Sequence, residues 1–501
     1  MSRIVLCTLN ARYIHTAFGL RYLYANMGEL QAETMLLEFG IQQRPVDMAE
    51  QLLQQQPRII GLGVYIWNVA EITALVGILK LVAPETVIVL GGPEVSHPPD
   101  LPAVADLADF IVTGHGEISF PELCRQILAG QTPTENIIPG KTAALTELAS
   151  PYPFYSDNDI RQRIVYVEAS RGCPFKCEFC LSSLDVTAKP FPLQRFLDDM
   201  EQLYQRGARN FKFIDRTFNL KTDTSVAILE FFLSKIPEDL YLHFEVIPDN
   251  LPDKLQQAIA KFPPGCLQFE IGVQSFDPEI QQRISRRQDN AKTKANLSWL
   301  RQHSHAHIHA DLIAGLPGDT LHGFGRSFDE LVALKPQEIQ VGILKRLRGA
   351  PINRHNESYQ LRYDPNPPYA IIKSRDMSFD DLQRINRFAR FWDLIGNSSR
   401  FHNTLPIILA EQPFARFMSL SDALFAIDGS TWKIALKRLF ELVYQAMTET
   451  LDVPQDTASR ALALDYSLNG EKGLPDFLRD KPRQTKRLKA NQRQRQAQPL
   501  N

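Results

Sequence analysis

Long apolar runs are missing from this chain of 501 residues, and none approaches the roughly 20 residues that a membrane-spanning helix needs. The chain also lacks a surplus of charge, since 55 Lys and Arg oppose 57 Asp and Glu and leave a net charge of −2. This balance gives no overall attraction to nucleic acid or to an anionic membrane. The opening residues, MSRIVLCTLN, run into a strand-like segment and lack the three-part layout of a signal peptide. We therefore expect a soluble cytoplasmic protein. We expect neither a membrane nor a nucleic acid as its partner.

Cysteine is scarce too, with six in the whole chain. A chain of this length gains little from a disulfide framework, and Cys173, Cys177 and Cys180 lie close together in the sequence. Such clustering indicates metal binding in a reducing compartment. The others are expected to be buried, with the packing role of small hydrophobic residues: Cys7, Cys124 and Cys266.

Residues 1–130 alternate between short apolar runs and amphipathic stretches. Strands are expected at Arg3–Leu9, Met35–Phe39, Ile59–Ile66, Thr86–Leu90 and Phe110–Thr113, and helices at Ala17–Leu30, Met48–Gln55, Ala70–Ala83 and Glu117–Leu128. Strict alternation of this kind predicts an α/β domain with a doubly wound parallel sheet, covered by helices on both faces. Ligands bind such sheets at the carboxyl ends of the strands, where this sequence places glycines and small polar residues.

The rest of the chain divides into four segments by composition. Residues 131–163 hold several prolines and are expected to be a linker. Residues 164–350 alternate again, and their six strand–helix units predict a partial (β/α)6 barrel with its chemistry at the strand carboxyl ends. Residues 351–478 have a mostly helical pattern, and residues 479–501 are basic and poor in apolar residues, which predicts a disordered tail. The barrel strands are expected at Ile164–Ala169, Asn210–Ile214, Tyr241–Val246, Gln268–Ile271, His309–Ile313 and Ile339–Leu344.

The cysteine cluster follows a predicted strand and Gly172, with the spacing C-x3-C-x2-C. Three thiolates on one short loop can hold three irons of a cubane cluster, and the fourth iron then lacks a protein ligand. Ordinary electron-transfer clusters use four cysteines, so a three-cysteine loop indicates an iron kept open for a substrate or cofactor. The alternative is a zinc site closed by a distant His or Cys, although C-x3-C is unusual for zinc and no paired C-x2-C or H-x3-H follows.

This spacing after the first strand of a β/α series resembles the radical S-adenosylmethionine (SAM) superfamily. In that family the open iron of a 4Fe–4S cluster chelates SAM, and reduction of the cluster cleaves SAM to a 5′-deoxyadenosyl radical. The resemblance implies 4Fe–4S ligation by Cys173, Cys177 and Cys180. It also implies a SAM-binding role for five further residues, Phe179, Asp215, Glu245, Gln274 and Gly315.

Three later motifs carry the resemblance further. Phe213–Asn219 resembles the family's D-D-x-F run, except that Arg216 replaces the second acid. Gly272–Ser275 resembles its G-x-Q-S motif, and Asp311–Thr320 resembles its D-x-I-x-G-L-P-G-E-T motif. The motifs occur in the family's order, so the resemblance covers the whole predicted barrel.

The first domain resembles the cobalamin-binding arrangement, in which a corrinoid lies over the strand carboxyl ends. The turns Gly91–Glu94 and Gly114–Glu117 are similar to the G-G-x-x and G-x-G-E turns of that group. Glycine is needed wherever a bulky planar ligand approaches the backbone. The implied cobalamin contacts are Gly63, Asn68, Gly91, Gly92, Gly114, Glu117 and His15.

His15 departs from the usual cobalamin motif, D-x-H-x-x-G, whose histidine replaces the lower axial ligand of cobalt. In Tyr13–Gly19 the aspartate is absent and the glycine comes one position late. His15 is therefore either a cobalt ligand or a loop histidine that bonds to the backbone or caps the next helix. Cobalamin bound without a protein axial ligand is a third possibility.

The segment Ser150–Tyr155 and the helical extension resemble a subgroup of cobalamin-binding radical SAM proteins with a C-terminal domain of unknown function. The resemblance implies an enzyme that uses a 4Fe–4S cluster, SAM and cobalamin to methylate, rearrange or oxidise an unidentified substrate. Its electron would come from a donor such as a flavodoxin or ferredoxin. Two alternatives stay open: a cobalamin-independent radical SAM oxidoreductase or methylthiotransferase, and an RNA-binding protein that acts through the basic tail. A methylthiotransferase normally has three more cysteines in its first domain, where this chain has only Cys7 and Cys124.

Overall fold

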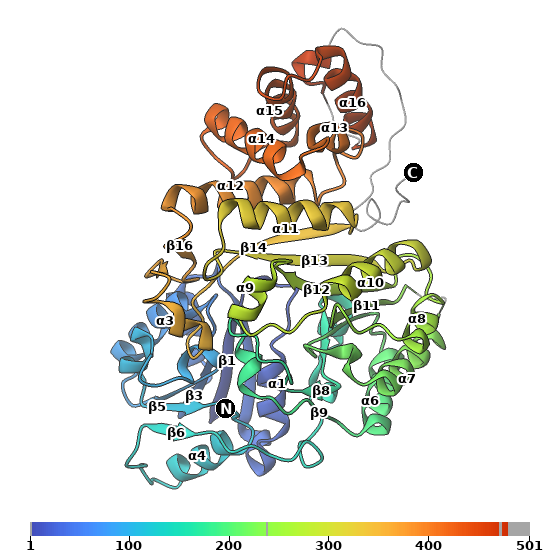
Figure 1. Cartoon of the computed structure of the whole chain (residues 1–501). Coiled ribbons are helices and arrows are strands. Elements are labelled where there is room, and N and C mark those ends of the chain that lie inside the picture. The colour runs from blue at the N-terminus through green and yellow to red at the C-terminus, as the bar shows by residue number, and fades with distance from the viewer. Residues whose placement is uncertain (1–2, 237–238, 470–472, 479–501) are drawn as a thin grey trace.

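The computed structural model describes residues 3–236, 239–469 and 473–478 (Figure 1). Its N-terminal part contains a parallel six-stranded sheet with the order β2-β1-β3-β4-β5-β6. The strands are β1 (Ile4–Asn10), β2 (Thr34–Gly40), β3 (Ile59–Gly63), β4 (Val87–Gly91), β5 (Phe110–Thr113) and β6 (Ile137–Pro139). The strand order reverses between β1 and β3, and open α/β sheets bind ligands at such a reversal.

Helices cover both faces of this sheet, because successive residues of a strand point to opposite sides. Val5 and Cys7 of β1 belong to a core shared with α2 and α3. Ile4 and Leu6 of the same strand belong to a core shared with α1 and α4 on the other face. The doubly wound parallel sheet expected from the sequence is confirmed. The helices span Phe18–Ala25 (α1), Pro45–Leu53 (α2), Val69–Val82 (α3) and Ser119–Leu128 (α4).

Part of the stretch expected as a linker, residues 131–163, is built into the fold. Strand β6 lies within it, pairs with β5 and adds a sixth strand to the five that the sequence predicts. Further on, Ser156 and Asp159 form a reciprocal capping box at the start of α5 (Asp157–Gln162). Strand β6 was missed because a run of three residues that ends in proline has too little periodicity to be recognised.

The second sheet is also parallel, with the order β14-β13-β12-β11-β10-β7. Within the described residues no pairing joins β7 to β14, so the partial (β/α)6 barrel expected from the sequence is confirmed as an open one. The strands are β7 (Val165–Val167), β10 (Asn210–Phe213), β11 (Tyr241–Val246), β12 (Leu267–Gln274), β13 (His307–Ala314) and β14 (Glu338–Ile343). The accompanying helices are α6 (Leu193–Gln205), α7 (Thr222–Leu233), α8 (Asp253–Ile259), α9 (Pro278–Arg283), α10 (Asn290–His303) and α11 (Leu321–Ala333).

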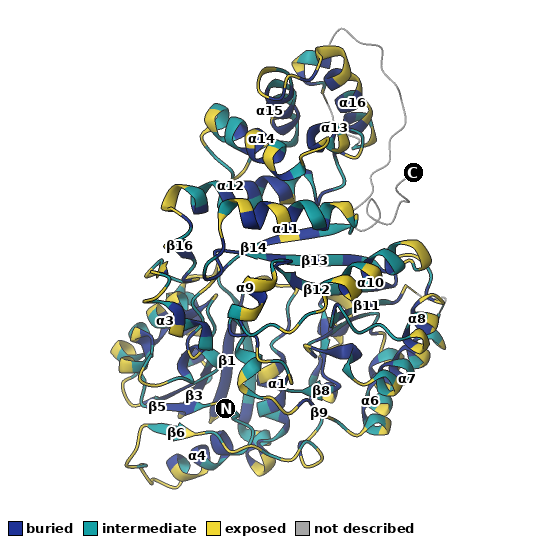
Figure 2. Ribbon diagram, in the orientation of Figure 1, coloured by how far each residue is buried: buried dark blue, intermediate teal, exposed yellow. Residues whose placement is uncertain are grey.

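The C-terminal part is mostly helical, as expected, and packs against α11 (Figure 1). Phe328 of α11 makes edge-to-face contacts with Phe388 and Trp392 of α12, so the helical part shares its core with the barrel. The buried faces of these helices point inward in Figure 2. A short ribbon of β15 (Arg362–Tyr363) and β16 (Ile371–Lys373) precedes them. The helices are α12 (Phe379–Ile395), α13 (Leu405–Leu409), α14 (Pro413–Asp428), α15 (Leu436–Glu449) and α16 (Gln455–Leu468).

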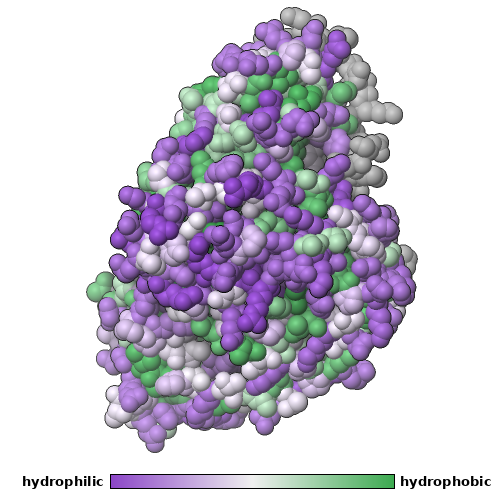
Figure 3. Space-filling model, in the orientation of Figure 1, coloured by the Kyte–Doolittle hydropathy of each residue, from purple (hydrophilic) through white to green (hydrophobic). Residues whose placement is uncertain are grey.

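The surface is mixed in character. On the face shown in Figure 3, hydrophobic side chains form separate patches among hydrophilic ones. Among the described residues, none of the helices combines the length and the apolar character needed to cross a membrane. The basic tail predicted for residues 479–501 lies outside the described residues.

Candidate functional site

The larger of two adjoining cavities lies between the two sheets and has a volume of about 750 Å³. One wall consists of the carboxyl ends of β1, β3, β4 and β5, around the reversal of strand order. The opposite wall comes from the second sheet and includes Tyr166, Lys212, Glu245 and Glu270. The residues expected to contact cobalamin that line this cavity are His15, Gly63, Gly91, Gly92, Gly114 and Glu117.

Glycine leaves the N-terminal wall of this cavity as bare backbone. Gly92 has a φ of +103°, and a Cβ there would lie 2.6 Å from the carbonyl oxygen of Val64, so glycine at this position lets the turn pack closely against the neighbouring backbone. Gly114 has a φ of +65°, and nothing lies within 4 Å of the position of its missing Cβ. A broad surface of this kind can accept a large planar ligand, so the wall fits a corrin ring.

Asn68 does not line this cavity, and its contact with cobalamin stays a prediction. Its Oδ1 accepts a hydrogen bond from the Tyr65 backbone N–H at 2.8 Å. Its Nδ2 donates to the carbonyl oxygens of Leu9 and Gly63, both at 3.1 Å. The fully buried Asn68 side chain therefore fixes the loop between β3 and α3 through hydrogen bonds to the backbone.

His15 lies where the two domains meet. Its backbone forms a bridge with Ile164, and its Nδ1 lies 2.7 Å from the hydroxyl oxygen of Tyr166 on β7. Burial lowers the pKa of His15, and the neighbouring cation Lys212 acts in the same direction. The His15 ring thus contacts a side chain rather than the backbone, and whether it binds cobalt stays a prediction.

Glu117 also connects the two domains. Its Oε1 accepts a hydrogen bond at 2.7 Å from Nη1 of Arg171, which belongs to β8 (Ser170–Arg171). Arg171 Nη2 also bonds to Glu168 at 3.0 Å. Because Arg171 lies just ahead of Cys173 in the chain, these bonds tie the G-x-G-E turn to the start of the cysteine loop.

The smaller cavity, of about 220 Å³, is lined by Cys173, Cys177 and Cys180. The loop enters through Gly172 with a φ of +91°, and the Cys173 N–H donates to the Asp185 carbonyl oxygen at 2.8 Å. In the described part of the chain, no three His, Cys, Asp or Glu side chains are placed to hold one metal ion together. A cubane cluster does not require three side chains to meet at one metal ion, because each cysteine binds a different iron.

Arg286 is a residue of this site that the sequence analysis missed. Burial raises the pKa of the Cys177 thiol, and Arg286, with Nη1 3.5 Å from the sulfur, lowers it. Arg286 also lines the smaller cavity. It follows α9 in an irregular segment, outside the motifs that carry the resemblance, so no local pattern marks it.

Gln274 lines the smaller cavity, together with Phe179 and Glu245, as the sequence predicts for SAM-binding residues. It ends β12 with a φ of +68°. Its Oε1 is buried and has no hydrogen-bond partner among the described residues. Because an unpaired buried oxygen is costly, this atom fits a site that receives a donor from a bound ligand.

Asp215 and Gly315 line neither cavity, and their contact with SAM stays a prediction. The Asp215 carboxylate accepts hydrogen bonds from the Ala169 N–H at 2.9 Å and the Ser170 hydroxyl at 2.6 Å, bracing the chain ahead of the cysteine loop. Burial raises the pKa of Asp215 to about 7, and these hydrogen bonds oppose the shift. Gly315 has a φ of +85°, and a Cβ there would lie 2.6 Å from Ile371 of β16. Its missing side chain therefore makes room for the C-terminal part of the chain.

The two cavities share a wall formed by Arg216, Glu245 and Glu270. Arg216 Nη1 donates to both carboxylate oxygens of Glu245, at 2.7 and 2.8 Å. Burial raises the pKa of Glu245, and Arg216 opposes that shift. Arg216, which stands in place of the family's second acid, thus pairs with an acid from the next strand.

Charged side chains cross the second sheet in one row, which the sequence analysis also missed. The strand register aligns Glu245, Glu270, His309 and Glu338 on β11 to β14. His243 Nε2 lies 2.9 Å from Glu270, and His309 Nδ1 lies 2.6 Å from Glu338. Burial alone would lower the pKa of His309, but hydrogen bonds and charge from its carboxylate neighbours raise it to about 11. This layer of the barrel is polar, whereas (β/α)8 barrels fill theirs with branched aliphatic residues.

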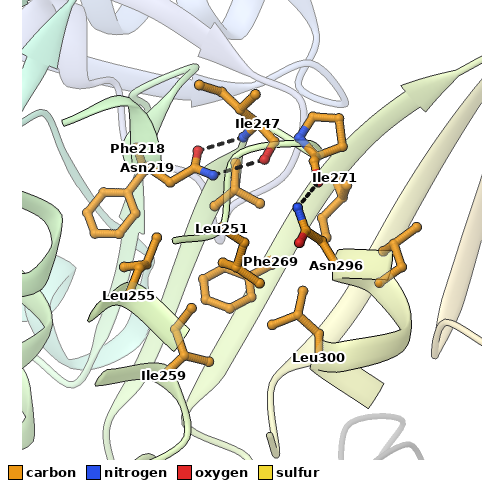
Figure 4. Close-up of a pocket in the computed structure, with 13 residues that line it drawn as sticks. Phe218, Asn219, Ile247, Leu251, Leu255, Ile259, Phe269, Ile271, Asn296 and Leu300 are labelled. Carbon is orange, nitrogen blue, oxygen red and sulfur yellow. Dashed lines mark hydrogen bonds between the residues drawn. The ribbon is translucent and has the colours of Figure 1, made fainter. Parts of the chain in front are cut away.

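Two asparagines fix the loop after β11 (Figure 4). Asn219 accepts from the Ile247 N–H at 2.6 Å and donates to the Ile247 carbonyl oxygen at 2.9 Å. Asn296 of α10 donates to the Pro248 carbonyl oxygen at 3.0 Å. A small apolar cavity of about 10 Å³ lies beside them. Because Ile247 and Pro248 also line the smaller cavity, these asparagines position one of its sides.

Comparison with protein families matches three models along the chain. A model of the B12 binding domain matches residues 4–124, and a model of the radical SAM superfamily matches residues 167–331. A third, described as a protein of unknown function (DUF4080), matches residues 357–500.

Curated proteins give the same picture at low identity. The cobalamin-dependent radical SAM methyltransferase TokK of Streptomyces tokunonensis is 24% identical over 362 residues, which cover 64% of this chain and 52% of TokK. The chain spans about half the length of the curated relatives it matches.

Two solved structures share the fold. The radical SAM methyltransferase TsrM of Kitasatospora setae, with cobalamin and a [4Fe-4S] cluster bound, has a TM-score of 0.57 at 18% identity, over 73% of this chain and 78% of TsrM. The cobalamin-dependent SAM radical enzyme OxsB has a TM-score of 0.62 at 12% identity, over 93% of this chain and 83% of OxsB. The three family models follow one another without overlap. The chain therefore combines, in this order, a B12-binding domain, a radical SAM domain and a DUF4080 domain.

Proposed function

We propose that this chain is an enzyme that uses a 4Fe–4S cluster, SAM and cobalamin to methylate, rearrange or oxidise an unidentified substrate. One observation carries the proposal: the cavity at the B12-binding sheet and the cavity at the cysteine loop share the wall of Arg216, Glu245 and Glu270. A substrate held at this wall would face both cavities. Chemistry that needs two cofactors requires such proximity.

The residues of the smaller cavity have separate roles in this proposal. Cys173, Cys177 and Cys180 would hold the cluster, and Arg286 offers a guanidinium suited to a carboxylate such as that of SAM. The buried Oε1 of Gln274 would accept a hydrogen bond from SAM. When bound, the cluster supplies the electron that cleaves SAM, and cobalamin supplies a transferable methyl group.

The residues of the larger cavity would hold cobalamin mainly by leaving space for it. Gly63, Gly91, Gly92 and Gly114 line the wall at the strand ends, where a corrin ring would lie against backbone. The ion pair of Glu117 with Arg171 would keep this wall in register with the cysteine loop.

The electron donor in this proposal is a small acidic carrier, such as a flavodoxin or ferredoxin. Two exposed cations lie beside the cysteine loop: Lys176, between Cys173 and Cys177, and Arg287, next to Arg286. Cations in these positions would speed the encounter with an acidic protein, and added salt would slow it.

Anaerobic reconstitution of the full chain with iron and sulfide tests the proposal. We expect the optical and spin-resonance signals of a 4Fe–4S cluster, 5′-deoxyadenosine on addition of SAM and dithionite, and retention of hydroxocobalamin through gel filtration. Absence of the cluster or of deoxyadenosine would contradict the radical SAM assignment. Both signals without cobalamin retention would favour the cobalamin-independent alternative, which the match to the B12-binding model disfavours.

Substituting His15 tests whether it binds cobalt. We expect His15→Ala to retain hydroxocobalamin and to leave the spin-resonance spectrum of reduced Co(II) cobalamin unchanged, because Tyr166 and Ile164 hold this residue where the domains meet. The matched control is Tyr166→Phe, which removes only the hydroxyl that contacts the ring. A nitrogen splitting present in the unmodified protein and lost in His15→Ala would instead make His15 the axial ligand.

A further inference from the structure

Glu178 lies between two of the cluster cysteines, and its carboxylate and backbone groups all form hydrogen bonds with neighbouring segments. Its Oε1 accepts hydrogen bonds from the Ser285 hydroxyl at 2.6 Å and from Arg354 Nη2 at 2.7 Å. Its Oε2 accepts from Arg354 Nε at 2.9 Å and lies 3.0 Å from His355 Nε2. Its backbone N–H donates to Ile284, and its carbonyl oxygen accepts from the Ile352 N–H.

This carboxylate is buried, yet it lines neither cavity. Its effect on a ligand therefore passes through its neighbours in the chain, Cys177 and Phe179, which both line the smaller cavity. Burying a charge is costly unless it is paired and hydrogen-bonded, and here the partners satisfy both oxygens. Such an anchor fixes the backbone of the loop that carries it.

Arg354 and His355 belong to a strap, residues 345–356, which links the barrel to the helical C-terminal part. Near its start, Arg348 Nε donates to Glu94 at 2.9 Å, and both Arg346 and Arg348 pair with Asp100. Glu94 is buried and follows Gly92 in the turn at the larger cavity. In Figure 1 the segment after β14 runs toward the blue N-terminal domain.

We infer that Glu178 is the positioning residue of the cysteine loop, and that the strap sets this loop against the turn of the B12-binding domain. One end of the strap is fixed at Glu94 and Asp100, and the other at Glu178. Loosening Glu178 thus frees the loop that holds the cluster and leaves both cavity walls chemically intact. The inference rests on the proposed cluster, and it assigns the strap a part in holding it.

Two substitutions in the reconstituted full chain test this role. Glu178→Gln removes the charge, and Arg354→Ala removes a partner whose side chain is 63% exposed and whose loss leaves the core intact. We expect a chelator to remove iron about tenfold faster from Glu178→Gln, the effect of losing about one charge-assisted hydrogen bond. Arg354→Ala should also raise the rate of iron removal, and Arg354→Lys should bring that rate part of the way back to the value of the unmodified protein. The control is Arg375→Ala, a nearby half-exposed cation that pairs with Asp376.

Spin resonance of the reduced cluster separates positioning from general destabilisation. We expect SAM to shift the signal of the unmodified protein and to shift it less in Glu178→Gln and Arg354→Ala, at temperatures well below the unfolding midpoint of each variant without iron. Unmodified rates and spectra in both variants would overturn the inference, as would an equal effect of Arg375→Ala. If Glu178→Gln does not fold, Arg354→Ala alone decides. An unmodified protein that forms no cluster would refute the proposed function, whereas a normal cluster in both variants would refute only the role of Glu178.

Discussion

Replacing Cys177 with alanine should leave the protein without a 4Fe–4S cluster and bring 5′-deoxyadenosine formation below detection. Three thiolates line the smaller cavity, and a cubane held by three cysteines has no spare protein ligand once one is lost. The checks are iron and sulfide per chain after anaerobic reconstitution, followed by chromatography of the SAM products. Cobalamin retention should persist, because Cys177 does not line the larger cavity.

Cys266→Ala is the matched control for this experiment. Cys266 is buried in the apolar core and lines neither cavity, so its loss removes a small packing group and no ligand. We expect normal iron content and deoxyadenosine, with a stability loss of about 1 kcal/mol in thermal unfolding. A full cluster in Cys177→Ala would show that another residue completes the site, and the three-cysteine assignment would then fail.

Gly91→Leu should lower the affinity for hydroxocobalamin by about 10- to 100-fold, the range expected for overpacking a filled site. A Cβ at Gly91 would meet only the Val112 carbonyl oxygen, at an ordinary 3.6 Å, so the backbone accepts the change. The rest of the leucine would take up space in a wall that is otherwise bare. Absorbance titration with hydroxocobalamin measures the affinity, and iron content reports separately on the cluster.

Gly77→Leu provides the corresponding control for the glycine experiment. Gly77 lies on α3, away from both cavities, and nothing is within 4 Å of the position of its missing Cβ. This variant should bind hydroxocobalamin as the unmodified protein does. Equal affinity in Gly91→Leu would mean that the ligand does not lie against this wall.

Local patterns predict those parts of the site that one short segment builds alone. The cysteine loop needs only its own spacing and the strand before it, and the glycine turns need only the end of one strand. Asp215, Gly315 and Asn68 also belong to, or lie beside, recognisable motifs, yet the side chains of Asp215 and Asn68 bond to neighbouring segments, and Gly315 leaves room for Ile371. Membership of a motif predicts where the backbone of a residue lies in the fold, whereas the contacts of its side chain depend on packing by distant segments.

Residues that act through distant partners leave no local pattern. Glu178 meets Arg354 across 176 positions of the chain, and nothing in either neighbourhood links them. The charged row on β11 to β14 is partly visible in the sequence, since polar and apolar residues alternate in LQFEIGVQ and HIHADLIA. Alternation predicts a strand with two unlike faces, but only the strand register aligns four such strands into one row.

That row limits how this protein can change in length over evolution. Side chains alternate along a strand, so inserting or deleting one residue within β12 would turn Glu270 away from its neighbours Glu245 and His309 and toward the covering helices. Each such event would bury unpaired charge in an apolar layer and break the ion pairs that remain. Insertions and deletions should therefore gather in the connecting loops and at the chain ends, while the lengths of these strands stay constant among descendants of the same ancestor.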